Sequence, residues 1–172
     1  MVPSANGQLV SLQNQIAGTI QDGGIAGGTG GGLTLASPLS ADGTYAGTIL
    51  GGANTYTGLT TIGAGNALLL ASLASTPASI ATSSDVVNNG IFDISINAPI
   101  TRISGSPLVI PPSTTSIKTL SGNGIVALGN QNLELTQASD TFSGLITDDG
   151  YARQYAAANP SGIAVSGGGS LT

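Results

Sequence analysis

Three aspartates near the C-terminal end are the side chains best suited to acid–base chemistry. Asp148 and Asp149 are adjacent, and Asp140 precedes them in the chain. Two carboxyl groups at a defined separation across a sugar can hydrolyse a glycosidic bond. Consecutive residues of an extended strand point to opposite faces, so Asp148 and Asp149 cannot both face one sugar. We therefore expect this pair to form a turn or a helix cap.

A glycine-rich segment, 27–33, offers a second candidate for chemistry, because such loops can hold ions. It has the glycines of calcium-binding β-rolls but lacks the aspartate that ligates the metal. It also lacks the Lys-Ser/Thr pair that follows the glycines of a phosphate-binding loop. The sequence predicts no metal site here, and the glycines are better explained as corner residues.

The composition removes most other catalytic chemistries. The chain contains no His and no Cys, which excludes a Cys/His zinc site, a Ser-His-Asp triad and a thiol nucleophile. We therefore expect a protein that is not an enzyme and that needs no cofactor.

The segment 150–161 carries the residues best suited to contacting a partner. Its alanines are typical of one or two helical turns, ended by Pro160. Tyr151 and Tyr155 would share a face of that helix, and Arg153 lies between them. Tyr and Arg are favoured contact residues. The structural alternative is a segment that folds over the body of the protein as a local cap.

A second segment, 97–115, contains four prolines and Arg102. Prolines are rare in the middle of a sheet because they cannot donate a ladder hydrogen bond. We therefore predict that 97–115 is a protruding loop, like 150–161, and we count Arg102 among the binding candidates.

Charge and hydropathy narrow the range of partners. The 172 residues include 3 basic and 8 acidic side chains, for a net charge of −5. Three scattered bases cannot neutralise a run of phosphates, so nucleic-acid binding is not expected. No apolar stretch reaches the length of about 18 residues that a membrane helix needs, and no signal peptide is recognisable after Met1. We expect no membrane insertion of this segment.

Short apolar runs separated by Gly, Asn, Asp or Ser indicate how the chain folds. Examples are Ile91–Ile96, Ile117–Leu120 and Leu133–Leu135. Runs of this length predict an all-β protein. Aromatic residues are only 3% of the chain, which favours a narrow solenoid with a thin aliphatic core over a sandwich. At roughly 20 residues per coil, glycines would turn the corners and asparagines would form ladders along the stack.

Internal repetition supports a solenoid. A pattern of aromatic residue or Ile, small residue, Gly and then x-Ile occurs three times, at 16–20, 45–49 and 142–146. Repetition with a preserved order is typical of repeat architectures.

One segment carries a specific resemblance. It resembles the passenger-associated β-strand repeat of bacterial autotransporters in Gly52, Asn54, Thr55, Tyr56, Gly58, Thr60 and Ile62. The segments 87–94, 117–124 and 133–146 also resemble coils of autotransporter passengers. The resemblance implies that residues 1–172 form a single segment of a right-handed parallel β-helix and a fragment of a longer rod. It also implies that the residues of the motif have structural roles.

The same resemblance implies a location and a function. Passenger domains are exported across the outer membrane of Gram-negative bacteria, and then stay on the cell surface or are secreted. We therefore expect a structural or adhesive segment that contacts a host surface or identical passenger chains, as virulence-associated adhesins do. A cut solenoid exposes strand edges, which predicts end-to-end oligomers. The alternative is a carbohydrate-active β-helix, a lyase or hydrolase, that uses Asp140, Asp148 and Asp149.

Overall fold

A computed structural model describes residues 2–3, 9–23, 27–73, 76–99, 110–150 and 162–165 of the chain. These residues form short β-strands joined by turns, and the described part contains no helix. The expectation of an all-β protein is therefore confirmed.

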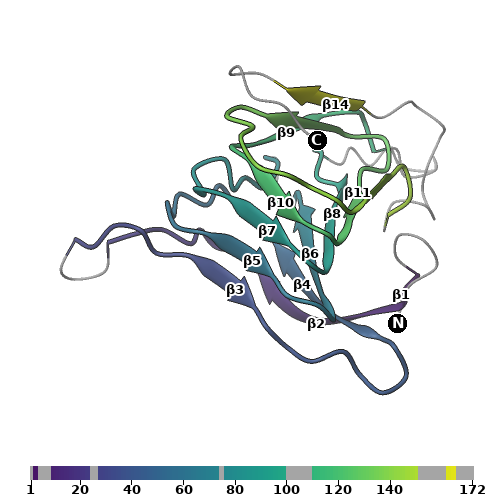
Figure 1. The fold of residues 1–172 in the computed structure, drawn as a ribbon. Coiled ribbons are helices and arrows are strands. Elements are labelled where there is room, and N and C mark those ends of the chain that lie inside the picture. The colour runs from purple at the N-terminus through teal and green to yellow at the C-terminus, as the bar shows by residue number, and fades with distance from the viewer. Residues whose placement is uncertain are drawn as a thin grey trace, which may run out of the picture.

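The strands belong to three sheets (Figure 1). The seven-stranded sheet contains, in spatial order, β1 (Val2–Pro3), β2 (Leu9–Ile16), β4 (Tyr45–Leu50), β6 (Asn66–Ala71), β8 (Ile91–Ile96), β11 (Ile125–Ala127) and β13 (Leu145–Thr147). The four-stranded sheet contains β10 (Leu120–Gly122), β7 (Val86–Asn88), β5 (Thr60–Ile62) and β3 (Leu33–Leu35). The three-stranded sheet contains β14 (Gly162–Val165), β12 (Asn132–Leu135) and β9 (Thr114–Ile117).

All strand pairs except one are parallel, and consecutive strands of the chain from β2 to β14 lie in different sheets. The exception is β1, which pairs antiparallel with β2 at the edge of the seven-stranded sheet. Each sheet therefore grows by one strand as the chain advances, and the strand colours in Figure 1 progress from purple to green up the stack. Parallel pairing of this kind needs a long connection between neighbouring strands, which here runs through the other sheets.

The core is a column of side chains stacked in register between the sheets. Leu68 of β6, Phe92 of β8 and Val126 of β11 are register partners, and all three are fully buried in one apolar cluster. In the four-stranded sheet the buried positions alternate along β5 and β7, as expected for strands with one face toward a core. Burial of each large aliphatic side chain contributes about 1.5–3 kcal/mol.

The opposite face of the seven-stranded sheet is also partly covered. All six residues of β6 and all six of β8 are buried, and Ala67, Leu69 and Ile91 form a second apolar cluster with Val10. These residues alternate along their strands with the core residues, so they point away from the main core.

A tight corner at the end of β10 requires glycine at position 122. Gly122 has φ +101°, a conformation that side chains rarely adopt. A Cβ atom there would also lie 2.2 Å from the backbone oxygen of Asn88 in the neighbouring segment. The close stacking of successive corners therefore requires glycine at this position.

The two predicted loops lie largely outside the described residues, so their protrusion stays a prediction. Asn97, Ala98 and Ile110, at the ends of the first loop, are buried, and β9 begins at Thr114 inside the predicted range. Of the second loop only Gly150 belongs to the described part.

Candidate functional site

The repeat motif is built around the side chain of Asn54, which is 2% exposed. Its Oδ1 accepts a hydrogen bond from the backbone N–H of Ile20 at 2.8 Å, and its Nδ2 donates to the carbonyl oxygens of Gly52 and Ser79 at 3.1 Å each. Ile20 lies in the connection between β2 and β3, Asn54 in the one between β4 and β5, and Ser79 in the one between β6 and β7. These three connections are successive passages of the chain from the seven-stranded to the four-stranded sheet. One amide therefore ties three successive passages of the chain together.

Other buried amides make the same kind of contact. Asn66 accepts from the backbone N–H of Ser37 at 3.0 Å and donates to its carbonyl oxygen at 2.8 Å. Asn97 does the same with Ala78, at 2.7 and 2.9 Å. A side-chain amide has both a donor and an acceptor, so it can satisfy a backbone N–H and a C=O where no ladder continues.

Tyr56 and Thr60 of the motif form a buried chain of hydroxyl groups. The Tyr56 hydroxyl lies 2.7 Å from Oγ1 of Thr60, which lies 2.9 Å from Oγ of Ser83. Ser83 in turn donates to the carbonyl oxygen of Gly58 at 2.9 Å. Burial raises the pKa of Tyr56 above its ordinary value of 10.0, against the opposing effect of the Thr60 hydrogen bond.

The remaining motif residues contact neighbouring segments of backbone. The N–H of Thr55 donates to the carbonyl oxygen of Ile20 at 2.9 Å. Gly58 packs so closely that a Cβ atom would lie 2.3 Å from the backbone oxygen of Gly30, and Gly52 has φ +78°. Ile62 is fully buried in the core. Each of these contacts is one that packing and corner formation require.

The acidic candidates lie in turns beside two different sheets. Asp140 precedes the bridge between Phe142 and Gly122 on the four-stranded sheet, and its Oδ2 accepts from the Thr119 hydroxyl at 2.8 Å. Asp148 and Asp149 follow β13 of the seven-stranded sheet. The N–H of Asp149 donates to Oγ1 of Thr147 at 3.2 Å, which is a turn contact of the kind expected from the sequence.

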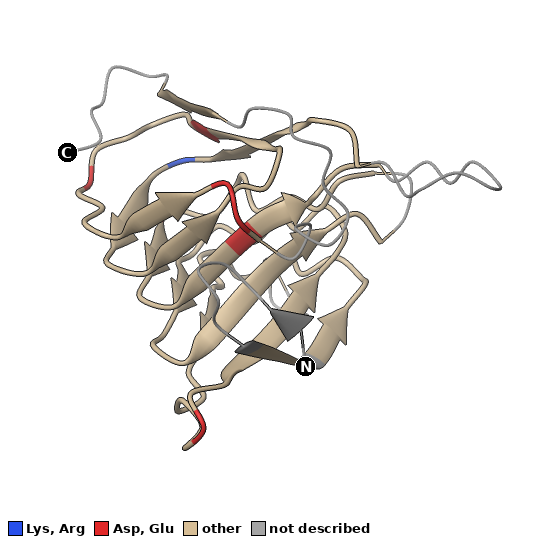
Figure 2. Ribbon diagram, turned by 90° about the vertical axis from the view of Figure 1, so that its right-hand side faces the viewer, with Lys and Arg blue, Asp and Glu red and all other residues tan. Residues whose placement is uncertain are grey.

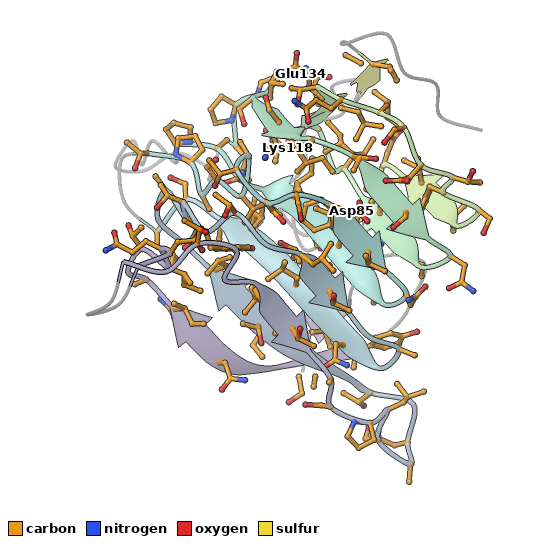
Figure 3. The ribbon with its side chains drawn as sticks, turned by 60° about the vertical axis from the view of Figure 1, so that its left-hand side comes forward. Asp85, Lys118 and Glu134 are labelled. Carbon is orange, nitrogen blue, oxygen red and sulfur yellow. The ribbon has the colours of Figure 1, made fainter. Side chains whose placement is uncertain are left out.

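Asp140 has a carboxylate neighbour that the sequence did not single out, Asp85. Oδ2 of Asp85 accepts from the Ser121 hydroxyl at 2.9 Å, whereas Oδ1 is shielded from solvent and has no hydrogen-bond partner among the described residues. Desolvation raises the pKa of Asp85, and the nearby charge of Asp140 raises it further. Figure 3 shows Asp85 on the same side of the molecule as Lys118, whose Nζ donates to the carbonyl oxygen of Thr82 at 2.8 Å.

The glycine-rich segment lies against the carboxylate of Asp22. Oδ2 of Asp22 accepts from the N–H groups of Gly30 and Thr57 at 3.1 Å each, and from the Thr57 hydroxyl. The Thr57 hydroxyl is the main cause of the lowered pKa of Asp22. Nowhere in the described ranges do three or more acidic side chains gather in a way that could hold a metal ion. Figure 2 shows that charged residues are sparse along the described ribbon.

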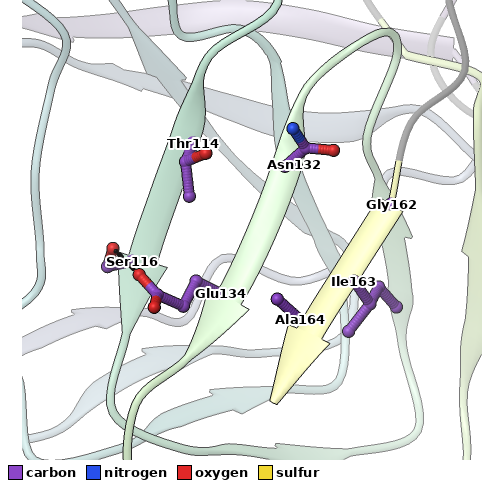
Figure 4. Close-up of a pocket in the computed structure, with 7 residues that line it drawn as sticks. All are labelled: Thr114, Ser116, Asn132, Glu134, Gly162, Ile163 and Ala164. Carbon is purple, nitrogen blue, oxygen red and sulfur yellow. Dashed lines mark hydrogen bonds between the residues drawn. The ribbon is translucent and has the colours of Figure 1, made fainter. Parts of the chain in front are cut away.

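The outer face of the three-stranded sheet carries a shallow groove (Figure 4). It has a volume of about 510 Å³ and is lined by Thr114, Ser116, Asn132, Glu134, Gly162, Ile163 and Ala164. Sequence reasoning missed this groove. Alternation in Leu133-Glu134-Leu135 places Glu134 on an outer face, but it does not reveal which strands lie beside it.

The binding candidates Arg102, Tyr151, Arg153 and Tyr155 lie outside the described residues, so their role stays a prediction. In the part of the chain that is described, no helix has the length and apolarity needed to cross a membrane. Comparison with protein-family models, with curated proteins and with solved structures finds no match.

Proposed function

We propose that the chain is a segment of a right-handed parallel β-helix from the passenger of a bacterial autotransporter. In this proposal it is a structural scaffold, not an enzyme, that displays adhesive or self-associating surfaces on a Gram-negative cell. It would reach that surface by export across the outer membrane and remain there or be secreted.

The observation that carries the proposal is the order in which the chain visits the three sheets. It passes through β7, β8 and β9, and then through β10, β11 and β12, and each later strand pairs in parallel with its earlier counterpart. A third passage follows through Phe142, β13 and β14, each again beside its counterpart. Repeated circuits of this kind are what a solenoid requires. The Asn-centred contacts of the repeat motif support the resemblance to passenger repeats.

Self-association is supported by the last described strands of the stack. Leu145 of β13, and Ile163 and Val165 of β14, are 38–45% exposed. They lie on strands that have a partner on one side only among the described residues. A strand edge with apolar side chains is a template for pairing with another chain. A second copy is therefore the partner that this end of the stack favours.

Bacteria that display the chain on their surface provide the test of the proposed function. We expect such cells to aggregate or to adhere to host cells more than cells that display an unrelated domain. In parallel, the purified chain should sediment as concentration-dependent oligomers, and a variant with Ile163→Lys and Val165→Lys should shift toward monomer. Cells that neither aggregate nor adhere would contradict an adhesive role, and turnover of a polysaccharide by the purified chain would contradict a scaffold without catalysis.

A further inference from the structure

The outer face of the three-stranded sheet presents two rows of side chains that cross the strands. Strand register places Thr114 beside Asn132 and Gly162, and it places Ser116 beside Glu134 and Ala164. Figure 4 shows these residues along one face of β9, β12 and β14. Adjacent strands are about 4.8 Å apart, so the polar side chains of β9 lie beside those of β12 at a spacing close to the length of one sugar ring.

The groove exists because the side chains change size from one strand to the next. Asn132 and Glu134 on β12 have long polar side chains, whereas their partners on β14 are Gly162 and Ala164. The surface therefore steps down at β14. A Cβ atom added at Gly162 would lie 3.2 Å from Oδ1 of Asn132, so even a methyl group there would narrow the groove.

The groove has polar groups that are available to a ligand. The Thr114 hydroxyl and the Asn132 amide make no side-chain hydrogen bond within the described ranges, while Ser116 donates to Oε2 of Glu134 at 2.6 Å and so fixes the orientation of that carboxylate. A hydroxyl both donates and accepts, an amide does both through separate atoms, and a carboxylate accepts. Together they can satisfy neighbouring hydroxyl groups of one ligand, each of which also donates and accepts.

The charge of the groove selects among ligands. Glu134 is the single charged residue among those that line it, so the groove would repel phosphates, sulfates and uronic acids. A lysine-rich peptide would find only one carboxylate, that of Glu134, for its several positive charges. The methyl group of Ala164 offers carbon surface to the C–H groups of a sugar ring. We infer that this groove binds an uncharged glycan and holds it without cleaving it.

This inference deepens the proposed function, and it rests on that function for its biological setting, because a glycan is a ligand that a surface-displayed scaffold would meet. The groove is open and is lined by no aromatic side chain, so we expect affinity in the millimolar range for a single site. Many copies on one cell would raise the effective affinity through multivalency.

Binding of purified protein to short oligomers of glucose, mannose, xylose and N-acetylglucosamine tests the inference. Ligand-observed NMR and calorimetry detect weak binding, and a heparin oligosaccharide and a lysine-rich peptide serve as charged competitors. We expect at least one uncharged oligomer to bind. Thr114→Ala and Asn132→Ala should each weaken that binding by about 2- to 10-fold, the effect of losing one hydrogen bond. Ala164→Leu, which fills the groove, should abolish it.

Thr61→Ala is the matched control, because Thr61 is a partly exposed threonine on β5 of another sheet. It should leave glycan binding unchanged, and circular dichroism should show that all variants keep their strand content. The inference is overturned if no uncharged oligomer binds at millimolar concentration, or if Ala164→Leu and Asn132→Ala bind as the unmodified chain does. Binding of heparin or of the basic peptide in preference to the uncharged oligomers would also overturn it.

The two proposals fail in distinguishable ways. If displayed cells aggregate or adhere while the purified chain binds no uncharged oligomer, the glycan inference is wrong and the adhesive function stands. If the oligomers bind through the groove but cells neither aggregate nor adhere, the site stands and the adhesive function is wrong.

Discussion

Asn54 gives the sharpest test of how the repeat motif stabilises the fold. Replacement by alanine removes the acceptor of the Ile20 N–H and the donor to the oxygens of Gly52 and Ser79. The two oxygens keep a backbone partner, because the N–H of Ser79 donates to Gly52 and the N–H of Asn54 donates to Ser79, at 3.0 Å each. The Ile20 N–H is left without its acceptor.

The cost of Asn54→Ala follows from these contacts. An unsatisfied backbone donor costs about 1–3 kcal/mol, and the space vacated by a side chain that is 2% exposed adds to it. We expect a loss of about 2–3 kcal/mol in the free energy of unfolding. For a chain of this size that corresponds to a decrease of roughly 5–10 °C in Tm.

Asn54→Asp separates the hydrogen bonds from the volume of the side chain. The introduced carboxyl group can still accept from Ile20, but when ionised it faces the carbonyl oxygens of Gly52 and Ser79. Burial and these oxygens would raise its pKa. The variant should therefore be least stable at neutral pH and recover stability as the pH falls and the group is protonated.

Thermal and urea denaturation followed by circular dichroism measure both variants. Asn123→Ala is the matched control, since Asn123 is exposed and lies in the turn between β10 and β11; it should change stability by less than about 0.5 kcal/mol. If Asn54→Ala were as stable as Asn123→Ala, the amide would contribute nothing to the stacking of the segments. That result would refute the structural role of the motif.

Three further substitutions probe the interior and the corners. Asp85→Asn should stabilise the protein at neutral pH, because the raised pKa of the carboxyl costs stability as the pH rises above its ordinary value of 3.8. Urea denaturation should show this gain disappear below that pH, and a gain that persists in acid would contradict it. Tyr56→Phe removes the hydrogen bond to Thr60 and should lower the free energy of unfolding by about 1 kcal/mol in the same assay. An unchanged midpoint would show that the hydroxyl contributes nothing to stability. Gly122→Ala should lose about 3 kcal/mol or prevent folding, since its φ and the close oxygen of Asn88 leave no room for a side chain; a Tm equal to that of the unmodified chain would refute the corner argument.

The sequence predicts a strand correctly where all residues of an apolar run belong to the same sheet. The run Ile91–Ile96 is strand β8 with the same bounds. The run Ile117–Leu120 was predicted as one strand, yet Ile117 ends β9 and Leu120 begins β10 in a different sheet. Both side chains are buried, so hydrophobicity alone does not distinguish a straight strand from one that turns a corner without Gly or Pro.

The resemblance predicts structural roles for the motif residues, whereas no local pattern of the sequence predicts the candidate sites. The Asp85–Asp140 pair and the groove both depend on which distant strands become neighbours. That register is set by the full length of each circuit through the sheets, including segments with no periodic signal. Local periodicity reports which face a residue occupies, whereas the identity of its cross-strand neighbours is a property of the whole chain.

The direction in which a side chain points separates the positions that stabilise this fold from the positions that form its surface. Inward positions such as Leu68 and Phe92 are fixed by stacking in register, and buried amides such as Asn54 satisfy the backbone where strands end. Outward side chains neither pack in the core nor satisfy the backbone, so their size can change from one strand to the next without disturbing the core. The step from Asn132 to Gly162 is such a change, and it produces a groove on the outer face of the sheet. A change in the size of one or two outward side chains is therefore enough to shape the surface of such a sheet without altering its core.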